Sequence, residues 1–289
     1  MVLKISVSKH GLLKKFLSNN KLASHMRLGG CSILRVVYMN IKKLIRRLIH
    51  SESYPNMRLS LRDLRRWGFK PMTAVDVGAY TGEWTTMFKS IFSDAEVLMI
   101  EPQLQKQSTL EKVCSQFDGT VHVNNSLLGA GDDREVDFIE METGSSVFEE
   151  NSPYARHTVK KKLSTLDRVV RTDRPSWNRV DFLKLDVQGY EVEVLKGSQQ
   201  ILKEVEFILL EASLVQVNKA CPLIDEVIAV LGYSGFRLLD FCSQIRRKDG
   251  VLWQTDLIFV NQGSRFVPAP ELNGGIGGET NKRMALTKG

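Results

Sequence analysis

The sequence predicts an α/β protein whose mostly parallel β-sheet carries helices on both faces. Three observations indicate this class. Short apolar segments alternate with segments of helical spacing, a glycine-containing turn follows the first apolar segment, and polar residues end several of the others. Strands that alternate with helices along a chain usually pair in parallel, with the connecting helices packed on the two faces of the sheet.

The predicted strands are short and rich in β-branched and apolar residues. They span residues 73–77, 96–102, 120–126, 180–186, 206–212, 236–241 and 256–261. Apolar residues recur with helical spacing at 61–69, 82–92, 104–116, 190–202 and 222–231. Between the third and fourth strands, residues 129–170 contain alternating polar and apolar positions, which predict an inserted β-hairpin region. The sheet is therefore expected to have seven strands.

Charge and composition divide the chain into three regions. Residues 1–57 form a basic arm, 58–262 the main domain, and 263–289 a tail rich in Gly, Pro, Asn and Lys that we expect to be disordered. The first 70 residues carry 16 lysines and arginines against two acidic residues, whereas the remaining 219 carry 24 basic and 31 acidic side chains. The basic character of the protein thus belongs to its N-terminal segment.

Residues 31–50 predict a basic amphipathic helix with one apolar stripe. Such a helix packs on its own domain or on a second subunit of a homo-oligomer, or it lies on a membrane surface. No run of 18 apolar residues and no signal peptide occurs, so we expect a cytoplasmic protein, with peripheral membrane contact as the alternative. The four cysteines are scattered, without zinc-ligand spacing, so we predict no metal site.

The turn after the first predicted strand is the sharpest local motif. It reads Asp-Val-Gly-Ala-Tyr-Thr-Gly over residues 76–82. Glycines permit backbone conformations and close approaches that a Cβ atom forbids, so a ligand can lie against this main chain. The spacing is neither the dinucleotide fingerprint nor a P-loop, and an ordinary structural turn explains it as well.

Polar residues end the next two predicted strands. Glu101 follows Gly82 by 19 residues and can accept hydrogen bonds from both hydroxyls of a ribose. Asn124, Asn125 and Ser126 end the third strand, where an adenine edge can be recognised, although a plain Asx turn is the competing explanation. Together with the glycine turn, these residues predict a site for an adenosyl group.

The chain resembles the FkbM family of methyltransferases. The resemblance rests on DVGAYTGEWT (76–85), IEP (100–102), SS (145–146), STLD (164–167) and above all DFLKLDVQGYEVEVLKG (181–197), and it extends over about residues 61–261. It implies a Rossmann-like class I methyltransferase fold, S-adenosyl-L-methionine as cofactor, and O-methylation as the commonest reaction. Many members have Asn where this chain has Tyr80.

The resemblance and the fold class together suggest roles for individual residues. We predict that the cofactor is bound by Asp76, Gly78, Ala79, Tyr80, Gly82, Glu101, Pro102, Asn125, Ser126 and Asp186. Asp186 ends the fourth strand and is the leading candidate for a general base, although it can instead bind the cofactor's amino group or a metal ion. Lys184, the second catalytic candidate, lies on the same strand face, where it can orient Asp186, hold an acidic substrate or pair with a neighbouring carboxylate. Glu211, the third, is a second base or a substrate-binding group.

We expect the acceptor to be a small molecule or a glycan, with the insert at 129–170 as its wall. Ser145, Ser146, His157 and the lysines at 160–162 lie in that insert. Two alternatives stay open: a nucleic-acid methyltransferase recruited by the basic arm, and a non-catalytic cofactor-binding partner subunit. The acidic main domain, and the absence of an Asn/Asp-Pro-Pro-Tyr segment at Asp186, argue against a nucleic acid.

Overall fold

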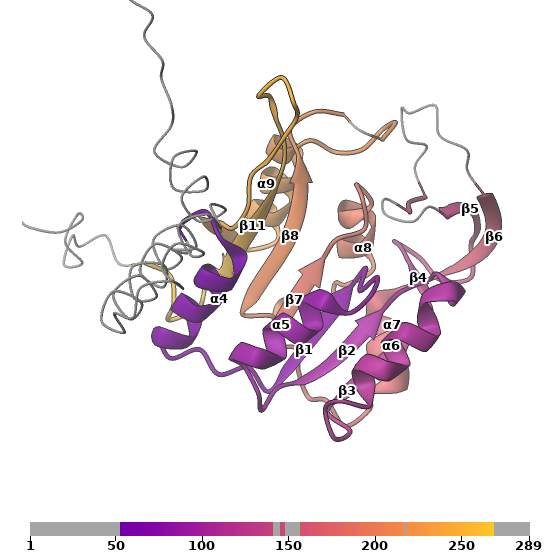
Figure 1. Ribbon diagram of the computed structural model, residues 1–289, viewed down its shortest axis with the longest axis horizontal. Helices are drawn as coiled ribbons and strands as arrows, with labels where there is room; N and C mark the ends of the chain where they lie inside the picture. Colours follow the sequence, from indigo (N-terminus) through magenta and orange to yellow (C-terminus); the bar gives the residue numbers. More distant parts are fainter. Residues whose placement is uncertain (1–52, 141–144, 148–156, 217, 269–289) are drawn as a thin grey trace, which may run out of the picture. The chain divides into compact units, whose positions relative to one another are not determined.

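A computed structural model describes residues 53–140, 145–147, 157–216 and 218–268 (Figure 1). The predicted basic helix at 31–50 and most of the predicted tail lie outside these residues. Residues 263–268, which the sequence assigns to the tail, are described, and the Phe266 ring lies 5.8 Å from the ring of Phe69. These six residues therefore pack with the main domain. None of the described helices is long and apolar enough to cross a membrane.

The central sheet confirms the predicted α/β class. Its strands are β1 (Thr73–Val77), β2 (Glu96–Ile100), β3 (Val121–Asn124), β7 (Phe182–Leu185), β8 (Phe207–Ser213), β9 (Phe236–Phe241), β10 (Ile245–Arg246) and β11 (Leu252–Asn261). The order is β10-β11-β8-β7-β1-β2-β3, with β9 also paired to β11. Five strands are parallel, whereas β11 pairs antiparallel with β8, β9 and β10.

The strand order puts a topological switch point between β1 and β7. The chain runs outward from β1 through β2 to β3 and then returns to the other side of β1. In open α/β sheets, ligands bind at such a point, beyond the carboxyl ends of the strands. The glycine turn after β1 and Asp186 after β7 therefore flank the expected crevice.

The prediction of seven strands is wrong by one. β10 has two exposed residues and no apolar periodicity, so nothing in its sequence marks it as a strand. β11 also begins at Leu252, four residues before the predicted start, because its first residues pair with β10.

Helices cover both faces of the sheet (Figure 1). They are α4 (Met57–Arg66), α5 (Glu83–Ile91), α6 (Gln107–Cys114), α7 (Leu166–Asp173), α8 (Glu191–Lys196) and α9 (Ile224–Tyr233), with 3-10 turns at Leu104–Lys106 and Ile201–Lys203. α4, α5 and α6 contribute to one apolar cluster, and α7, α8 and α9 to the other. In β1, Ala74 belongs to the first cluster and Val75 to the second, as strand alternation requires.

Helix α7 is an α-helix that the sequence analysis missed. It provides the crossover from β3 back to β7, and its apolar side chains are buried against the sheet. The Thr165 side chain accepts a hydrogen bond from the Arg168 backbone N–H at 3.2 Å, which is an N-cap. That cap is the local signal for the helix.

The insert forms a separate three-stranded sheet over the carboxyl edge. Its strands are β4 (Leu127–Leu128), β5 (Glu135–Glu140) and β6 (His157–Ser164), in the order β4-β6-β5. β5 and β6 pair antiparallel, which confirms the predicted hairpin, whereas β4 pairs parallel with β6. The Lys161 ammonium donates to the Pro102 carbonyl, so the insert is tied to the end of β2.

Candidate functional site

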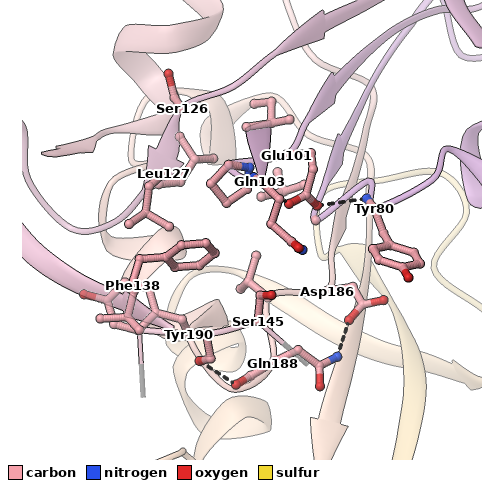
Figure 2. Close-up of a pocket in the computed structure, with 18 residues that line it drawn as sticks. Tyr80, Glu101, Gln103, Ser126, Leu127, Phe138, Ser145, Asp186, Gln188 and Tyr190 are labelled. Carbon is pink, nitrogen blue, oxygen red and sulfur yellow. Dashed lines mark hydrogen bonds between the residues drawn. The ribbon is translucent and has the colours of Figure 1, made fainter. Parts of the chain in front are cut away.

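A cavity lies where the carboxyl ends of β1, β2, β3 and β7 meet the insert (Figure 2). Its empty volume is about 790 Å³, including space that is open to solvent. Six of the ten predicted cofactor residues line it, namely Gly78, Tyr80, Glu101, Pro102, Ser126 and Asp186. The sequence prediction therefore selects residues that are distant in the chain and adjacent in the fold.

Glu101 is buried and fixed in position by the main chain. Its Oε2 accepts the Tyr80 N–H at 2.9 Å, and its Oε1 accepts the Gln103 N–H at 3.0 Å. Burial raises the pKa of Glu101, while these two N–H groups and the Lys184 charge oppose the rise. A carboxylate oxygen can accept two hydrogen bonds, so Glu101 can still accept hydrogen bonds from a vicinal diol in the cavity.

The glycines of the turn are required mainly because neighbouring parts of the fold pack closely against them. Gly78 has φ +75°, and a Cβ atom there would lie 1.8 Å from the Asp186 carbonyl oxygen. Gly82 has φ +77°, and its Cβ would lie 3.1 Å from a methyl group of Val113. We expected these glycines to admit a ligand; in the structure their missing Cβ atoms admit neighbouring elements. Only Gly78 also lines the cavity.

Four predicted cofactor residues do not line the cavity: Asp76, Ala79, Gly82 and Asn125. The Asp76 carboxylate is fully buried, forms an ion pair with Lys184 and accepts the Thr85 hydroxyl at 2.7 Å. The Ala79 methyl group packs in the cluster that contains α5. Their contribution to the site is therefore the shape of the turn, and direct cofactor contact by them stays a prediction.

The polar residues at the end of β3 form the Asx turn that the sequence offered as the competing explanation. Asn124 Oδ1 accepts the Ser126 N–H at 2.7 Å, which is an Asx turn, and Asn124 Nδ2 donates to Asp173. This turn brings Ser126 to the cavity while Asn125 stays outside its lining. The structural explanation therefore holds for Asn124, whereas cofactor binding by Ser126 stays a prediction.

Lys184 lies beneath the cavity, between the ends of β1 and β7. Its ammonium is 3.0 Å from Asp76 Oδ1 and 3.7 Å from Asp186 Oδ2, and it donates to the Gly78 carbonyl at 2.8 Å. Burial alone lowers the pKa of Lys184, but the neighbouring carboxylates of Asp76 and Asp186 outweigh burial and raise it. Lys184 does not line the cavity, and its predicted role in catalysis stays a prediction.

Asp186 is the predicted catalytic residue that reaches the cavity. Its side chain is 37% exposed, whereas that of Lys184 is 5% exposed. The Gln188 amide donates to Asp186 Oδ1 at 2.9 Å and to Glu211 Oε2 at 3.1 Å (Figure 2 shows the first). Burial, followed by the negative charges of Asp186 and Asp256, raises the pKa of Glu211 well above its usual range. Glu211 does not line the cavity, so Asp186 is the one of these two carboxyl groups that is accessible from it.

Glu191 organises the loop after β7. Its Oε1 accepts the N–H groups of Val187 and Gly189 at 3.0 and 3.1 Å. Burial raises the pKa of Glu191 to about 7, although these hydrogen bonds oppose the rise. Glu191 therefore holds the turn between β7 and α8.

The insert supplies cavity residues that the sequence analysis did not single out. Phe138 and Val147 of the insert line the cavity, as do Leu127 and Leu128 just before it and Tyr190 from the loop before α8. Ser145 and Ser146 also line it, as expected for the substrate wall. The signal for the apolar residues was their alternation in the insert, which predicts a buried face without naming what it covers.

Two of the basic residues predicted in the insert, His157 and Lys160, lie beside acidic residues outside the cavity. The His157 side chain is 75% exposed and lies 3.6 Å from Glu140, and Lys160 forms an ion pair with Asp137. Neither lines the cavity. Within the described ranges, no group of three or more His, Cys, Asp or Glu residues has the arrangement of a metal site.

The residues present fit an adenosyl cofactor. A buried carboxylate with spare acceptor capacity suits a ribose diol, and Glu101 supplies it. The main chain at Gly78 and Tyr80 borders the same cavity, with Ser126 beyond the end of β3 and Asp186 on the side of β7 (Figure 2). An adenosyl group with a short polar chain matches this distribution.

Comparison with known proteins points in the same direction. A family model described as the methyltransferase FkbM domain matches residues 76–238, which is more than half of the chain. A search of curated proteins found no significant match.

Among solved structures, one similar protein is a magnesium protoporphyrin IX methyltransferase from Synechocystis PCC 6803. It is 10% identical, with 90% of this chain and 100% of that chain covered at a TM-score of 0.43. Another is a precorrin-6y C5,15-methyltransferase from Geobacter metallireducens GS-15, 9% identical, with coverages of 70% and 86% and a TM-score of 0.41. Similarity at this level carries no argument about substrate.

Proposed function

Because the chain belongs to the FkbM family of methyltransferases, and is thus an S-adenosylmethionine-dependent methyltransferase of class I fold, we propose that it methylates a hydroxyl group. The acceptor that we propose is a sugar, a glycan or a natural-product-like metabolite. The observation that carries the proposal is the Asp186 carboxylate, which is accessible at the wall of the cavity that Glu101 also lines.

The chain's own residues would hold the cofactor from β1 to β3. Glu101 would accept hydrogen bonds from the ribose hydroxyls, the main chain at Gly78 and Tyr80 would border the methionine part, and Ser126 would contact the adenine. S-adenosylmethionine, when bound, supplies a methyl group that its sulfonium sulfur already activates. The protein therefore has to position the acceptor and remove one proton.

Asp186 is suited to remove that proton. An alcohol is a poor nucleophile, and a base that accepts its proton while the oxygen–carbon bond forms contributes about 10²–10⁴-fold in rate. The hydroxyl proton would pass to Asp186, and Lys184, at 3.7 Å from Asp186 Oδ2, would hold the carboxylate in place. Lys184 thus acts in this proposal as a positioning residue, and Glu211 as a buried neighbour whose raised pKa favours its neutral form.

The lining of the cavity argues against an anionic acceptor. In the described part of the chain, its residues include apolar side chains and hydroxyls but no lysine, arginine or histidine. Recognition of nucleic acids depends on cationic contacts with phosphates, which this lining does not offer. The cytoplasmic location, the homo-oligomer and the membrane contact of the basic helix stay predictions from the sequence.

The test is to incubate the full chain with methyl-labelled S-adenosylmethionine and cell extracts separated into glycans, small molecules, lipids and nucleic acids. We expect the label in the glycan or small-molecule fraction, in a linkage that resists mild base, as an ether does. The Asp186→Asn variant should label the same fraction at a rate lower by about 10²-fold or more. Label in nucleic acid, or on nitrogen or carbon, would overturn the proposal.

A further inference from the structure

Gln188 connects the two carboxyl groups on the β7 and β8 side of the cavity. Its Nε2 atom donates to Asp186 Oδ1 at 2.9 Å and to Glu211 Oε2 at 3.1 Å. A primary amide has two N–H groups, so these bonds use both. Gln254, from the first residues of β11, donates separately to Glu211 Oε2 at 2.9 Å. Gln188 is therefore the amide through which Glu211 is linked to Asp186.

The backbone of Gln188 is held in an uncommon conformation. Its φ is +54°, in the left-handed region where residues other than glycine are rare. Its carbonyl accepts from Ser146 Oγ at 3.1 Å and from Asn218 Nδ2 at 2.6 Å. Glu191 fixes the N–H groups on either side of it. Such a conformation persists when the surroundings over-determine it, and it is typical of functional sites.

These contacts come from several separate parts of the fold. Ser146 belongs to the insert, Asn218 to the segment before α9, and Glu191 to α8. The insert lines the cavity and also holds the Gln188 carbonyl, so the wall of the site is mechanically linked to the amide that contacts Asp186 (Figure 2). If Gln188 only stabilised this loop, its side chain would not need to contact the Asp186 carboxylate, as it does.

We propose that Gln188 is a positioning residue, whose amide holds the Asp186 carboxylate toward the acceptor and joins it to Glu211. The proposal rests on the proposed function in that Asp186 is the base. An N–H donor stabilises the ionised form of a carboxyl group, which is the form that accepts a proton. It also fixes the orientation of the carboxylate, because Oδ1 is held by the amide and Oδ2 faces the ammonium of Lys184.

The charges around Asp186 make this donor important. Lys184 faces it from β7, Glu191 from α8, Glu211 from β8 and Asp256 from β11. Three of these four neighbours are acidic, and burial keeps the pKa values of all three raised. Within this set, the Gln188 amide and the Lys184 ammonium are the groups that offer the Asp186 carboxylate a favourable contact.

The experiment compares Gln188→Asn with Gln254→Met in the full chain. Asparagine tolerates positive φ, so it preserves the turn, but its side chain is one carbon shorter and cannot reach both carboxyl groups. Gln254→Met removes a donor to Glu211 and none to Asp186. A second variant, Gln188→Met, keeps the length of the side chain and removes both donors.

Two readouts separate positioning from stability. The first is the titration of carbon-13-labelled aspartate carboxyls by NMR, with Asp186 assigned from the signal lost in Asp186→Asn. We expect its midpoint to move to higher pH by at least about half a unit in Gln188→Asn, which is the order expected from losing one hydrogen bond. In Gln254→Met, which removes no hydrogen bond to Asp186, the midpoint should stay within about 0.2 of the wild-type value. The second is affinity for S-adenosylhomocysteine, which should stay within about threefold.

Turnover is measured on the fraction that the wild-type enzyme labels. We expect Gln188→Asn to lose about tenfold or more in kcat, with an acidic limb displaced to higher pH and activity partly restored there. An unmoved Asp186 midpoint, or equal shifts in both variants, would overturn the proposal. Absence of wild-type labelling in every fraction would instead contradict the proposed function, and the NMR titration would still decide the role of Gln188.

Discussion

The two halves of the carboxyl edge are built by different kinds of contact. In the cofactor half, at the ends of β1, β2 and β3, main-chain N–H groups hold Glu101. In the acceptor half, at the ends of β7 and β8 and the start of β11, side chains hold one another, with Gln188 between Asp186 and Glu211. The first half is fixed by the backbone and the second by the identity of its side chains.

This difference bears on how the two reactants are recognised. A carboxylate held by backbone donors keeps its place whatever the nearby side chains are, which suits a cofactor that does not change. A network of amides and acids changes its shape and charge with a single substitution. We therefore expect substitutions in the cofactor half to change affinity for S-adenosylmethionine, and those in the acceptor half to change turnover.

The largest effect is expected where the halves meet. Gly78→Ala would place a Cβ atom 1.8 Å from the Asp186 carbonyl, at a residue with φ +75°, so the ends of β1 and β7 would have to separate. We expect a loss of more than about 3 kcal/mol in unfolding free energy, or insoluble protein. Urea denaturation measures it.

Gly232→Ala in α9 is the matched control, because no atom lies within 4 Å of its Cβ position. It should be neutral or stabilise the helix by up to about 1 kcal/mol. Equal stability of the two variants would show that β1 and β7 do not approach as described.

Asp186→Asn tests the acceptor half alone. It keeps the shape of the side chain and removes the proton acceptor, so turnover should fall about 10²-fold or more. Affinity for S-adenosylmethionine, measured by calorimetry, should change less than about threefold. A variant that lost affinity and kept turnover would reverse the roles assigned to the two halves.

Glu191→Gln tests the stability of the acceptor half against pH. The folded-state pKa of about 7 lies above the usual 4.5, so between these values the unfolded chain releases a proton that the folded chain keeps. The free energy of unfolding of the wild-type protein should therefore fall, through Glu191, as pH rises from about 4.5 through 7. Glutamine stays neutral, and its oxygen can accept the same two N–H groups.

The variant should consequently gain in melting temperature over the wild type as pH rises from 5 to 8, by on the order of 5 °C. Thermal melts at several pH values measure this difference. A difference that is constant with pH would mean that Glu191 ionises equally in the folded and unfolded chains.

The smallest effect is expected for Glu101→Ala in the cofactor half. Affinity for S-adenosylmethionine should fall about tenfold, which corresponds to roughly 1.4 kcal/mol. Glu111→Ala, an exposed acidic residue of α6, is the control and should leave the affinity unchanged. If both variants bound equally well in calorimetry, Glu101 would have no role in holding the ribose.

The sequence predicted the cofactor half better than the acceptor half for a physical reason. Its signals are local: a glycine turn after β1 and an acidic residue after β2 imply their contacts through chain connectivity. The pairing of Asp186 with Glu211 through Gln188 depends on the register of β7, β8 and β11, which local spacing does not determine. Strand β10 was missed because its two exposed residues show no periodic pattern.

Some predicted residues shape the site without lining it. Asp76 belongs to the motif, yet its carboxylate points to Lys184 and Thr85 beneath the turn. A motif records every residue that a turn requires, including those that pack behind it. Which of them contact the ligand depends on side-chain direction at the strand end, and only the three-dimensional structure shows that.

The most direct test of the account is a crystal structure of the full chain with S-adenosylhomocysteine. We predict that the ribose hydroxyls lie within hydrogen-bond distance of both Glu101 oxygens and that the sulfur faces the Asp186 side of the cavity. An adenosyl group bound elsewhere, or a Glu101 carboxylate that still contacts only the N–H groups of Tyr80 and Gln103, would contradict the account.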